Sequence, residues 1–294
     1  MSLVVLVAYA IGVGIGLLAS RIDAFGRVWP VIVRTQLLIV AVALSITAVW
    51  SITSFDSVLW AGLAVVALGI MTIVTRLTTK GPEREQHAAL QVWSAAANTG
   101  FWMIPIGTAL WGPAGATFGV LMDRMATPLF GYWTHVIRRH APVRQRRRTT
   151  FIDQSPTIAL AVGVALRVTG PAPDWAHTIT YIAAPVLAAS GAAVFVGSIL
   201  HPSQRIDPRP GLRRWVALAS LRAVLFLLIA VFAPTPAIRV VAILGGLSIP
   251  VFGAPQMAAV YGYSDPTVAA GTRYGWFFGA AGLALAVAVT YWLA

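Results

Sequence analysis

Cysteine is absent from the 294 residues, so the chain can form neither a disulfide framework nor a cysteine-ligated metal site. Charge is also scarce, because Asp, Glu, Lys and Arg make up 10% of the residues. Soluble domains carry roughly a quarter. Hydrophobic residues account for 58% of the chain. We therefore expect a polytopic membrane protein and not a soluble globular domain.

Acidic residues are the rarer charge, with 9 Asp and Glu against 21 Lys and Arg, giving a net charge of +12. The basic residues lie between apolar segments and not on a polar domain, so we interpret them as topology signals and expect no nucleic acid partner. Gly-x-Ser-x-Gly, His-Glu-x-x-His and aspartate-rich motifs are missing, and no pair of histidines has ligand spacing. We expect no enzymatic activity, no metal site and no cofactor.

Ten apolar stretches are long enough to cross a bilayer. They run from about 3 to 20, 29 to 50, 57 to 76, 88 to 111, 114 to 137, 155 to 171, 178 to 200, 213 to 233, 238 to 261 and 267 to 293. The first lacks a basic leader and a small-residue cleavage site, so we expect a retained helix and not a signal peptide. The sequence thus predicts an all-α membrane protein with ten transmembrane helices.

One hydrophilic, Arg-rich insertion divides the chain into two halves of five spans. We expect a first repeat over residues 1–137, a linker over 138–154 and a second repeat over 155–294. Basic residues occur in alternate loops: Arg21, Arg27, Arg76, Lys80, Arg84, Arg138, Arg139, Arg144, Arg146, Arg147, Arg148, Arg205, Arg209, Arg213 and Arg214. The positive-inside rule then places this linker in the cytoplasm and both termini outside, in a multi-pass protein of the inner (plasma) membrane.

The two halves share a pattern in their fourth and fifth spans. Pro105 is followed seven residues later by Gly112, and Pro255 is followed seven residues later by Gly262. Asp123 and Arg273 lie at equal distances from these prolines, and the same spans contain Phe130-Gly131 and Phe278-Gly279. An odd number of spans per half gives the halves opposite orientations in the membrane, which predicts an inverted repeat of the kind found in many carriers.

Helix-breaking residues cluster in the fourth and ninth spans. The fourth contains Asn98, Gly100 and Pro105, and the ninth contains Gly245, Gly246, Pro250, Gly253 and Pro255. A single proline commonly only kinks a transmembrane helix. Interruptions at corresponding positions of both halves instead favour broken helices, whose half-helix N-termini offer unpaired N–H groups to an anion.

The fourth span resembles the crossover segment of the auxin efflux carrier family. The stretch Asn98-Thr99-Gly100-Phe101-Trp102-Met103-Ile104-Pro105 has that family's Asn-Thr pair ahead of Ile-Pro, and the aromatic-Gly pair Trp111-Gly112 closes the motif. Pro250, Pro255 and Pro266 match three prolines of the second crossover. Weaker likeness covers Ser155-Pro156, Val196-Gly197 and Arg222. Val251 replaces a Gln of the plant members, so auxin itself is not the expected substrate.

The resemblance implies a scaffold part and a mobile part that carries the crossed helices 4 and 9, with elevator-type alternating access. It also implies that Asn98 contacts a carboxylate substrate. The candidate substrate-binding residues are Asn98, Thr99, Pro105, Pro250 and Pro255. The expected function is secondary transport of small organic anions, with the organic anion and the lipid bilayer as partners and a homodimer as one alternative for the assembly.

Charged residues within the spans are candidates for coupling or for a structural pair, because charge at mid-bilayer is costly. They are Asp123, Arg273 and Arg222, and Asp123 could pair with Arg124 or Arg273, carry a proton or bind a cation. A sodium- or proton-coupled symporter of the bile acid carrier type is an alternative, although only Asn98, Thr99, Ser248 and Gln256 supply polar side chains near the breaks. A membrane receptor or scaffold that transports nothing is a further alternative.

Overall fold

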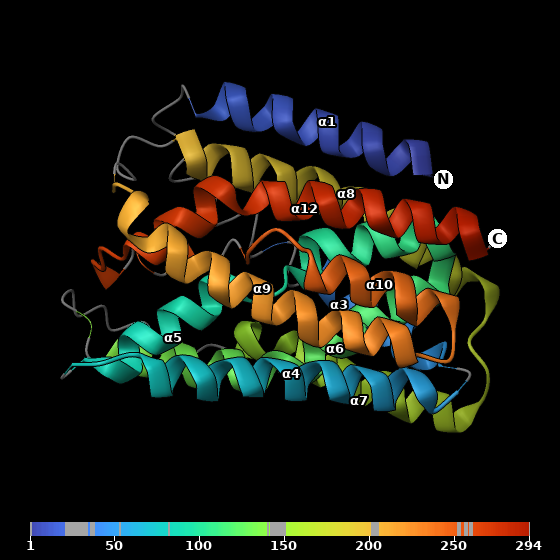
Figure 1. Cartoon of the computed structure of the whole chain (residues 1–294). Coiled ribbons are helices and arrows are strands. Elements are labelled where there is room, and N and C mark those ends of the chain that lie inside the picture. Colours follow the sequence, from blue (N-terminus) through green and yellow to red (C-terminus); the bar gives the residue numbers. More distant parts are fainter. Residues whose placement is uncertain are drawn as a thin grey trace. The chain divides into compact units, whose positions relative to one another are not determined.

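The computed structural model describes residues 2–20, 35, 39–52, 54–81, 83–139, 141, 151–200, 206–251, 254–255, 258 and 261–293. Their regular structure is helical, apart from one isolated β-bridge. The helices are α1 (Ser2–Ala19), α3 (Val40–Trp50), α4 (Asp56–Thr78), α5 (Arg84–Ala95), a π-helical turn η1 (Thr99–Met103), α6 (Ile104–Arg139), α7 (Phe151–Thr169), α8 (Asp174–Leu200), α9 (Arg209–Phe232), α10 (Pro236–Gly246) and α12 (Pro266–Leu293) (Figure 1).

Five stretches of these helices are long and apolar enough to cross a membrane. They are Asp56–Thr78, Thr99–Arg139, Asp174–Gly197, Arg209–Phe232 and Pro266–Leu293. Shorter apolar helices occupy Leu3–Ala19, Val40–Trp50, Ile158–Thr169 and Pro236–Gly246, within four further expected spans. The chain is therefore an all-α membrane protein. Three expected spans are only partly seen as helix. The second begins at residue 29, outside the described residues, the fourth is interrupted after Ala95, and the ninth is interrupted after Gly246.

The chain divides into two compact units, each built from segments of both halves. Unit 1 comprises Met1–Ala61, Thr99–Met125 and Arg147–Leu200, and unit 2 comprises Gly62–Asn98, Ala126–Arg146 and His201–Ala294. The repeats expected over residues 1–137 and 155–294 stay a prediction, because a division by spatial compactness does not test a likeness between the two halves. Residues 140 and 142–150 of the Arg-rich linker lie outside the described residues.

Unit 1 is held together by small apolar side chains between α1 and α8. Val5, Ala8, Ala184 and Ala188 form one buried cluster, with Tyr9 packed against it. The other face of α1 exposes Leu3, Val4, Leu6 and Ile11, as a lipid-facing helix does. The Nε1–H of Trp50 at the end of α3 donates to the carbonyl of Gly170 after α7, at 3.1 Å. These contacts join α1 to α8 and the end of α3 to the end of α7.

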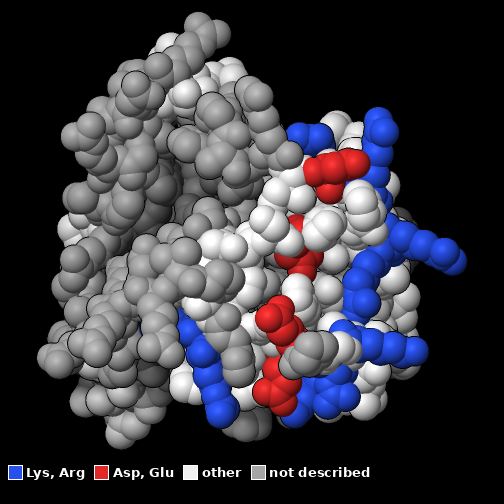
Figure 2. Space-filling model, turned by 90° about the vertical axis from the view of Figure 1, so that its left-hand side faces the viewer, with Lys and Arg blue, Asp and Glu red and all other residues white. Residues whose placement is uncertain are grey.

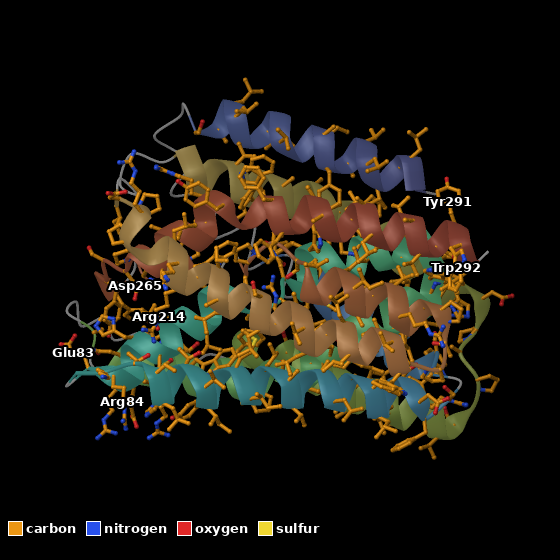
Figure 3. The ribbon with its side chains drawn as sticks, in the orientation of Figure 1. Glu83, Arg84, Arg214, Asp265, Tyr291 and Trp292 are labelled. Atoms are coloured by element: carbon orange, nitrogen blue, oxygen red, sulfur yellow. The ribbon has the colours of Figure 1, made fainter. Side chains whose placement is uncertain are left out.

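In unit 2, α12 runs between two chemically different ends. Near its start lie Glu83, Arg84, Arg214 and Asp265, whereas its last turns carry Tyr291 and Trp292, which are 82% and 81% exposed (Figure 3). Basic side chains surround acidic ones at the charged end, which Figure 2 shows face on. Exposed aromatic residues are typical of the membrane–water interface, so unit 2 carries the two different ends expected of a membrane-spanning body.

Candidate functional site

The fourth expected span is interrupted just before Thr99. Helix α5 ends at Ala95, and Ala96 is extended, with φ −62° and ψ 152°. Ala97 and Asn98 are not helical, and helical structure resumes in η1 at Thr99. Pro105 is the second residue of α6, where its missing N–H costs nothing because the first turn of a helix has no acceptor for it. The break therefore lies at Asn98, and Pro105 marks the start of the next helix.

The ninth expected span is interrupted in the same way. Helix α10 ends at Gly246, and the chain from Leu247 to Val251 is not helical. Pro250 has no N–H to give to a helix and disfavours helical geometry at Ile249. Pro255 lies in a short helical piece with Ala254, while residues 252–253 and 256–257 lie outside the described residues.

The two interruptions meet in unit 2. Ala97 and Pro250 form an antiparallel bridge. The backbone N–H of Asn98 donates to Oγ of Ser248 at 3.2 Å, and Nδ2 of Asn98 donates to the carbonyl of Pro250, also at 3.2 Å. Asn98 is 2% exposed, and it is the only asparagine in the sequence. Two candidate residues, Asn98 and Pro250, are thus brought together.

Helix α12 closes one side of this bridge. A Cβ added to Gly275 would lie 2.2 Å from Cδ of Pro250, closer than two carbon atoms can approach. A side chain larger than hydrogen at this position would push Pro250 out of the bridge. Gly275 therefore allows the non-helical segment after α10 to pack directly on the α12 backbone.

Arg222 of α9 joins the ends of both interrupted helices. It is fully buried, and its guanidinium donates to the carbonyl of Ala96 at 3.1 Å, of Gly246 at 2.9 Å and of Ser248 at 2.7 Å. It also donates to the carbonyl of Ala95. These carbonyls belong to the last turns of α5 and α10 and the residues after them, where a helix leaves its acceptors unpaired.

The positive charge of Arg222 nearly cancels the partial negative charges of the two helix C-termini. Each helix C-terminus carries a partial charge of about −0.5, so two of them together match the single positive charge of one guanidinium. The ion pairs found among the described residues do not include Arg222. Arg222, expected from the sequence as an intramembrane charge, therefore has backbone carbonyls as its hydrogen-bond partners.

The residues after the first interruption form a second polar group, in unit 1. The hydroxyl of Thr99 donates to Oδ1 of Asp123, and Nη2 of Arg124 lies 2.6 Å from Oδ2 of the same carboxylate. Tyr9 of α1 donates to the carbonyl of Phe101 in η1 at 2.7 Å. The structure thus brings Thr99 to Asp123 and confirms Arg124 as one partner of that carboxylate.

Two glycines at equivalent positions take the same unusual backbone geometry. Gly112 has φ +58° and Gly262 has φ +74°, values that favour glycine. Gly112 lies at a kink within α6, between the fourth and fifth expected spans. Gly262 lies between the ninth and tenth. The pattern of proline followed by glycine therefore corresponds to a turn between spans in both halves.

Arg273 is exposed on α12 in unit 2, whereas Asp123 belongs to unit 1. The expected Asp123–Arg273 pair stays a prediction.

Sequence reasoning missed the carbonyl acceptors of Arg222, which no side-chain pattern reveals. It also treated Ser248 only as one nearby polar side chain, although the 150 residues between Asn98 and Ser248 equal the separation of Pro105 and Pro255.

Within the described part of the chain, no group of three or more His, Cys, Asp and Glu side chains could hold a metal ion. The sequence matches no family model and no curated protein.

Proposed function

We propose that the protein is a secondary transporter of small organic anions, with a carboxylate bound where the interrupted fourth and ninth helices meet. The observation that carries the proposal is the bridge between Ala97 and Pro250, with Asn98 beside it, within a membrane-embedded helical unit. Interrupted helices at membrane depth are costly unless the freed backbone is buried or lines a binding cavity.

The chemistry of the bridge favours an anion held by neutral donors. Arg222 already neutralises the two helix C-termini, so a carboxylate beside them meets little repulsion from the helix dipoles. Helical structure begins again at Thr99 immediately after the first interruption, and helix starts present unpaired N–H groups. Asn98, Pro250 and Pro255, all of unit 2, are the proposed binding residues, and Thr99 and Pro105, which belong to unit 1, stay predictions from the sequence.

The division into two units supports an elevator-type mechanism. Unit 2 contains both interruptions, α9 and α12, whereas unit 1 contains α1, α3, α7 and α8. Each unit takes helices from both halves of the chain, as expected if one unit is a scaffold and the other carries the substrate. We further propose that the chain crosses the plasma membrane ten times, in two inverted repeats like those of the auxin efflux carrier family. The charged end then faces the cytoplasm.

Binding and transport test this proposal in sequence. Purified protein is heated in detergent with acetate, lactate, benzoate or phenylacetate, and a carboxylate that raises the melting temperature is then assayed for uptake into proteoliposomes. Asn98→Ala should lose the ligand-dependent shift. Gln91→Ala, another buried polar side chain of unit 2, is the matched control and should keep it. Absence of both binding and uptake with all four anions contradicts the proposal.

A further inference from the structure

The end of α4 and the start of α9 meet at the charged end of unit 2. Both helices are long and apolar enough to cross a membrane, with Arg76 in the last turn of α4 and Arg209, Arg213 and Arg214 near the start of α9. Nη2 of Arg214 donates to Oγ1 of Thr79, just after α4, at 2.6 Å. We call this contact between residues 76–80 and 209–214 the α4–α9 seam. It lies at the level where apolar surface gives way to charge.

Arg214 has no acidic partner in the described part of the chain. None of the ion pairs found among the described residues includes it. Its Nε is buried without a hydrogen-bond partner there, and its Nη2 contacts the hydroxyls of Thr78 and Thr79. A hydroxyl accepts a hydrogen bond but carries no charge. The positive charge of Arg214 is therefore unmatched by the residues that the structure describes.

The helix ends beside Arg214 do not offset its charge either. A helix C-terminus carries about −0.5 and a helix N-terminus about +0.5, so the end of α4 and the start of α9 cancel each other. Arg222 differs, because it lies between two C-termini. Arg214 is half-buried, and a charge at the edge of a bilayer without compensation is unfavourable. This indicates that an anion from outside the chain completes the site.

Exposed basic side chains add to the charge of the seam. Lys80 and Arg213, on either side of the contact, are both exposed. The acids closest to them in the sequence already have partners, since Oε2 of Glu83 lies 3.4 Å from Nε2 of His87 and Asp207 accepts a backbone N–H at 3.1 Å. Guanidinium and ammonium groups are common phosphate ligands in proteins. The seam therefore has the chemistry of a phosphate site.

Both helices also expose apolar side chains along their length. These are Leu63, Val66, Ile70, Ile73 and Leu77 of α4, and Val216, Val224, Leu228 and Val231 of α9. The α4 residues share one face of the helix, because their spacing follows its turn. Leu77 of this face is 74% exposed and lies in the seam itself. A molecule that carries a phosphate above acyl chains matches this order of charged and apolar surface.

We propose that the α4–α9 seam binds the phosphate of an anionic phospholipid such as phosphatidylglycerol, with Arg214 as the central contact and Lys80 and Arg213 beside it. The bound lipid supplies the negative charge that the described part of the chain lacks. A zwitterionic headgroup brings an ammonium group near these cations, so it fits the seam less well. The site lies within one unit and does not depend on the transported substrate.

Native mass spectrometry of the purified protein tests the site. The protein in detergent is titrated with phosphatidylglycerol or with phosphatidylcholine of the same acyl chains, and the wild type should bind the first more tightly. Arg214→Gln should weaken phosphatidylglycerol binding by about tenfold or more, as expected for loss of a hydrogen bond to a charged group. Phosphatidylcholine binding should not change. Arg84→Gln is the matched control, because it removes the same charge from an exposed arginine at the same end of unit 2 and should bind both lipids as the wild type does (Figure 3).

A second variant covers the case in which Arg214→Gln does not fold. Arg213→Gln changes an exposed side chain and should weaken phosphatidylglycerol binding by about fivefold. Inorganic phosphate alone tests for a free anion. If it raises the melting temperature of the wild type and not that of Arg214→Gln or Arg213→Gln, the site takes free phosphate and the lipid proposal is wrong. Equal affinity of the wild type for the two lipids, or equal phosphatidylglycerol affinity in the wild type and these variants, also overturns it.

Discussion

The backbone N–H of Asn98 donates to Oγ of Ser248, 150 residues further along the chain, at 3.2 Å. The same separation relates Pro105 to Pro255 and Gly112 to Gly262. Contact between equivalent residues is expected where a two-fold axis passes between two repeats, because positions near the axis lie near their own counterparts. The pair therefore supports the proposed inverted repeat at the point where it matters most, beside the candidate substrate site.

Ser248→Ala should destabilise the protein by about 1 to 3 kcal/mol, because it leaves the buried N–H of Asn98 without its acceptor. Thermal unfolding in detergent measures the effect. Ser190→Ala is the control, since that hydroxyl is bonded within its own helix at 2.7 Å to Val186 and a small change is expected. Equal melting temperatures for both variants would contradict the structural role of Ser248.

Substitution of Arg222 should be the most damaging change in unit 2. Arg222→Leu removes the donors for four carbonyls at two helix ends, and each lost bond to a charged group is worth about 1.5 to 3 kcal/mol. We expect loss of monodisperse protein in size-exclusion chromatography. Arg222→Lys keeps the charge and should recover part of the yield. Arg273→Gln changes an exposed arginine and should purify normally.

Gly275→Ala should destabilise the bridge by overpacking, by about 1 to 3 kcal/mol, because the added methyl group overlaps Pro250. Gly131→Ala is a matched control, since a Cβ there meets nothing within 4 Å and alanine favours the helix. The two melting temperatures should move in opposite directions. A melting temperature for Gly275→Ala at or above that of the wild type would be inconsistent with the close approach.

The topology prediction concerns the Arg-rich linker. Because the chain has no cysteine, Gln145→Cys introduces a single reactive thiol. The positive-inside rule predicts that an impermeant maleimide labels this thiol in inside-out vesicles and not in intact cells. Ala172→Cys, in the opposite loop after α7, should label with the reverse preference. Labelling of Gln145→Cys in intact cells would reverse the orientation.

The sequence was most informative where backbone chemistry restricts the chain. Pro250 and the residues around Asn98 indicated two interruptions, because proline acts locally on the backbone, whereas Gly112 and Gly262 were identified only as equivalent positions of the two halves. The partners of Arg222 could not be predicted, since main-chain carbonyls carry no sequence signature. The pairing of Asp123 with Arg124 was one of several alternatives. Adjacent residues on a helix point in different directions, so their spacing in the sequence does not by itself predict an ion pair.

The acceptors of Arg222 also constrain the order in which the protein assembles. Ala95 and Ala96 are synthesised and inserted long before α9 and α10, yet their carbonyls depend on a guanidinium from the second half. Until that half enters the membrane, the end of α5 has acceptors that lipid cannot satisfy. The first half expressed alone should therefore be a substrate for membrane proteases, and co-expression of the second half as a separate chain should protect it.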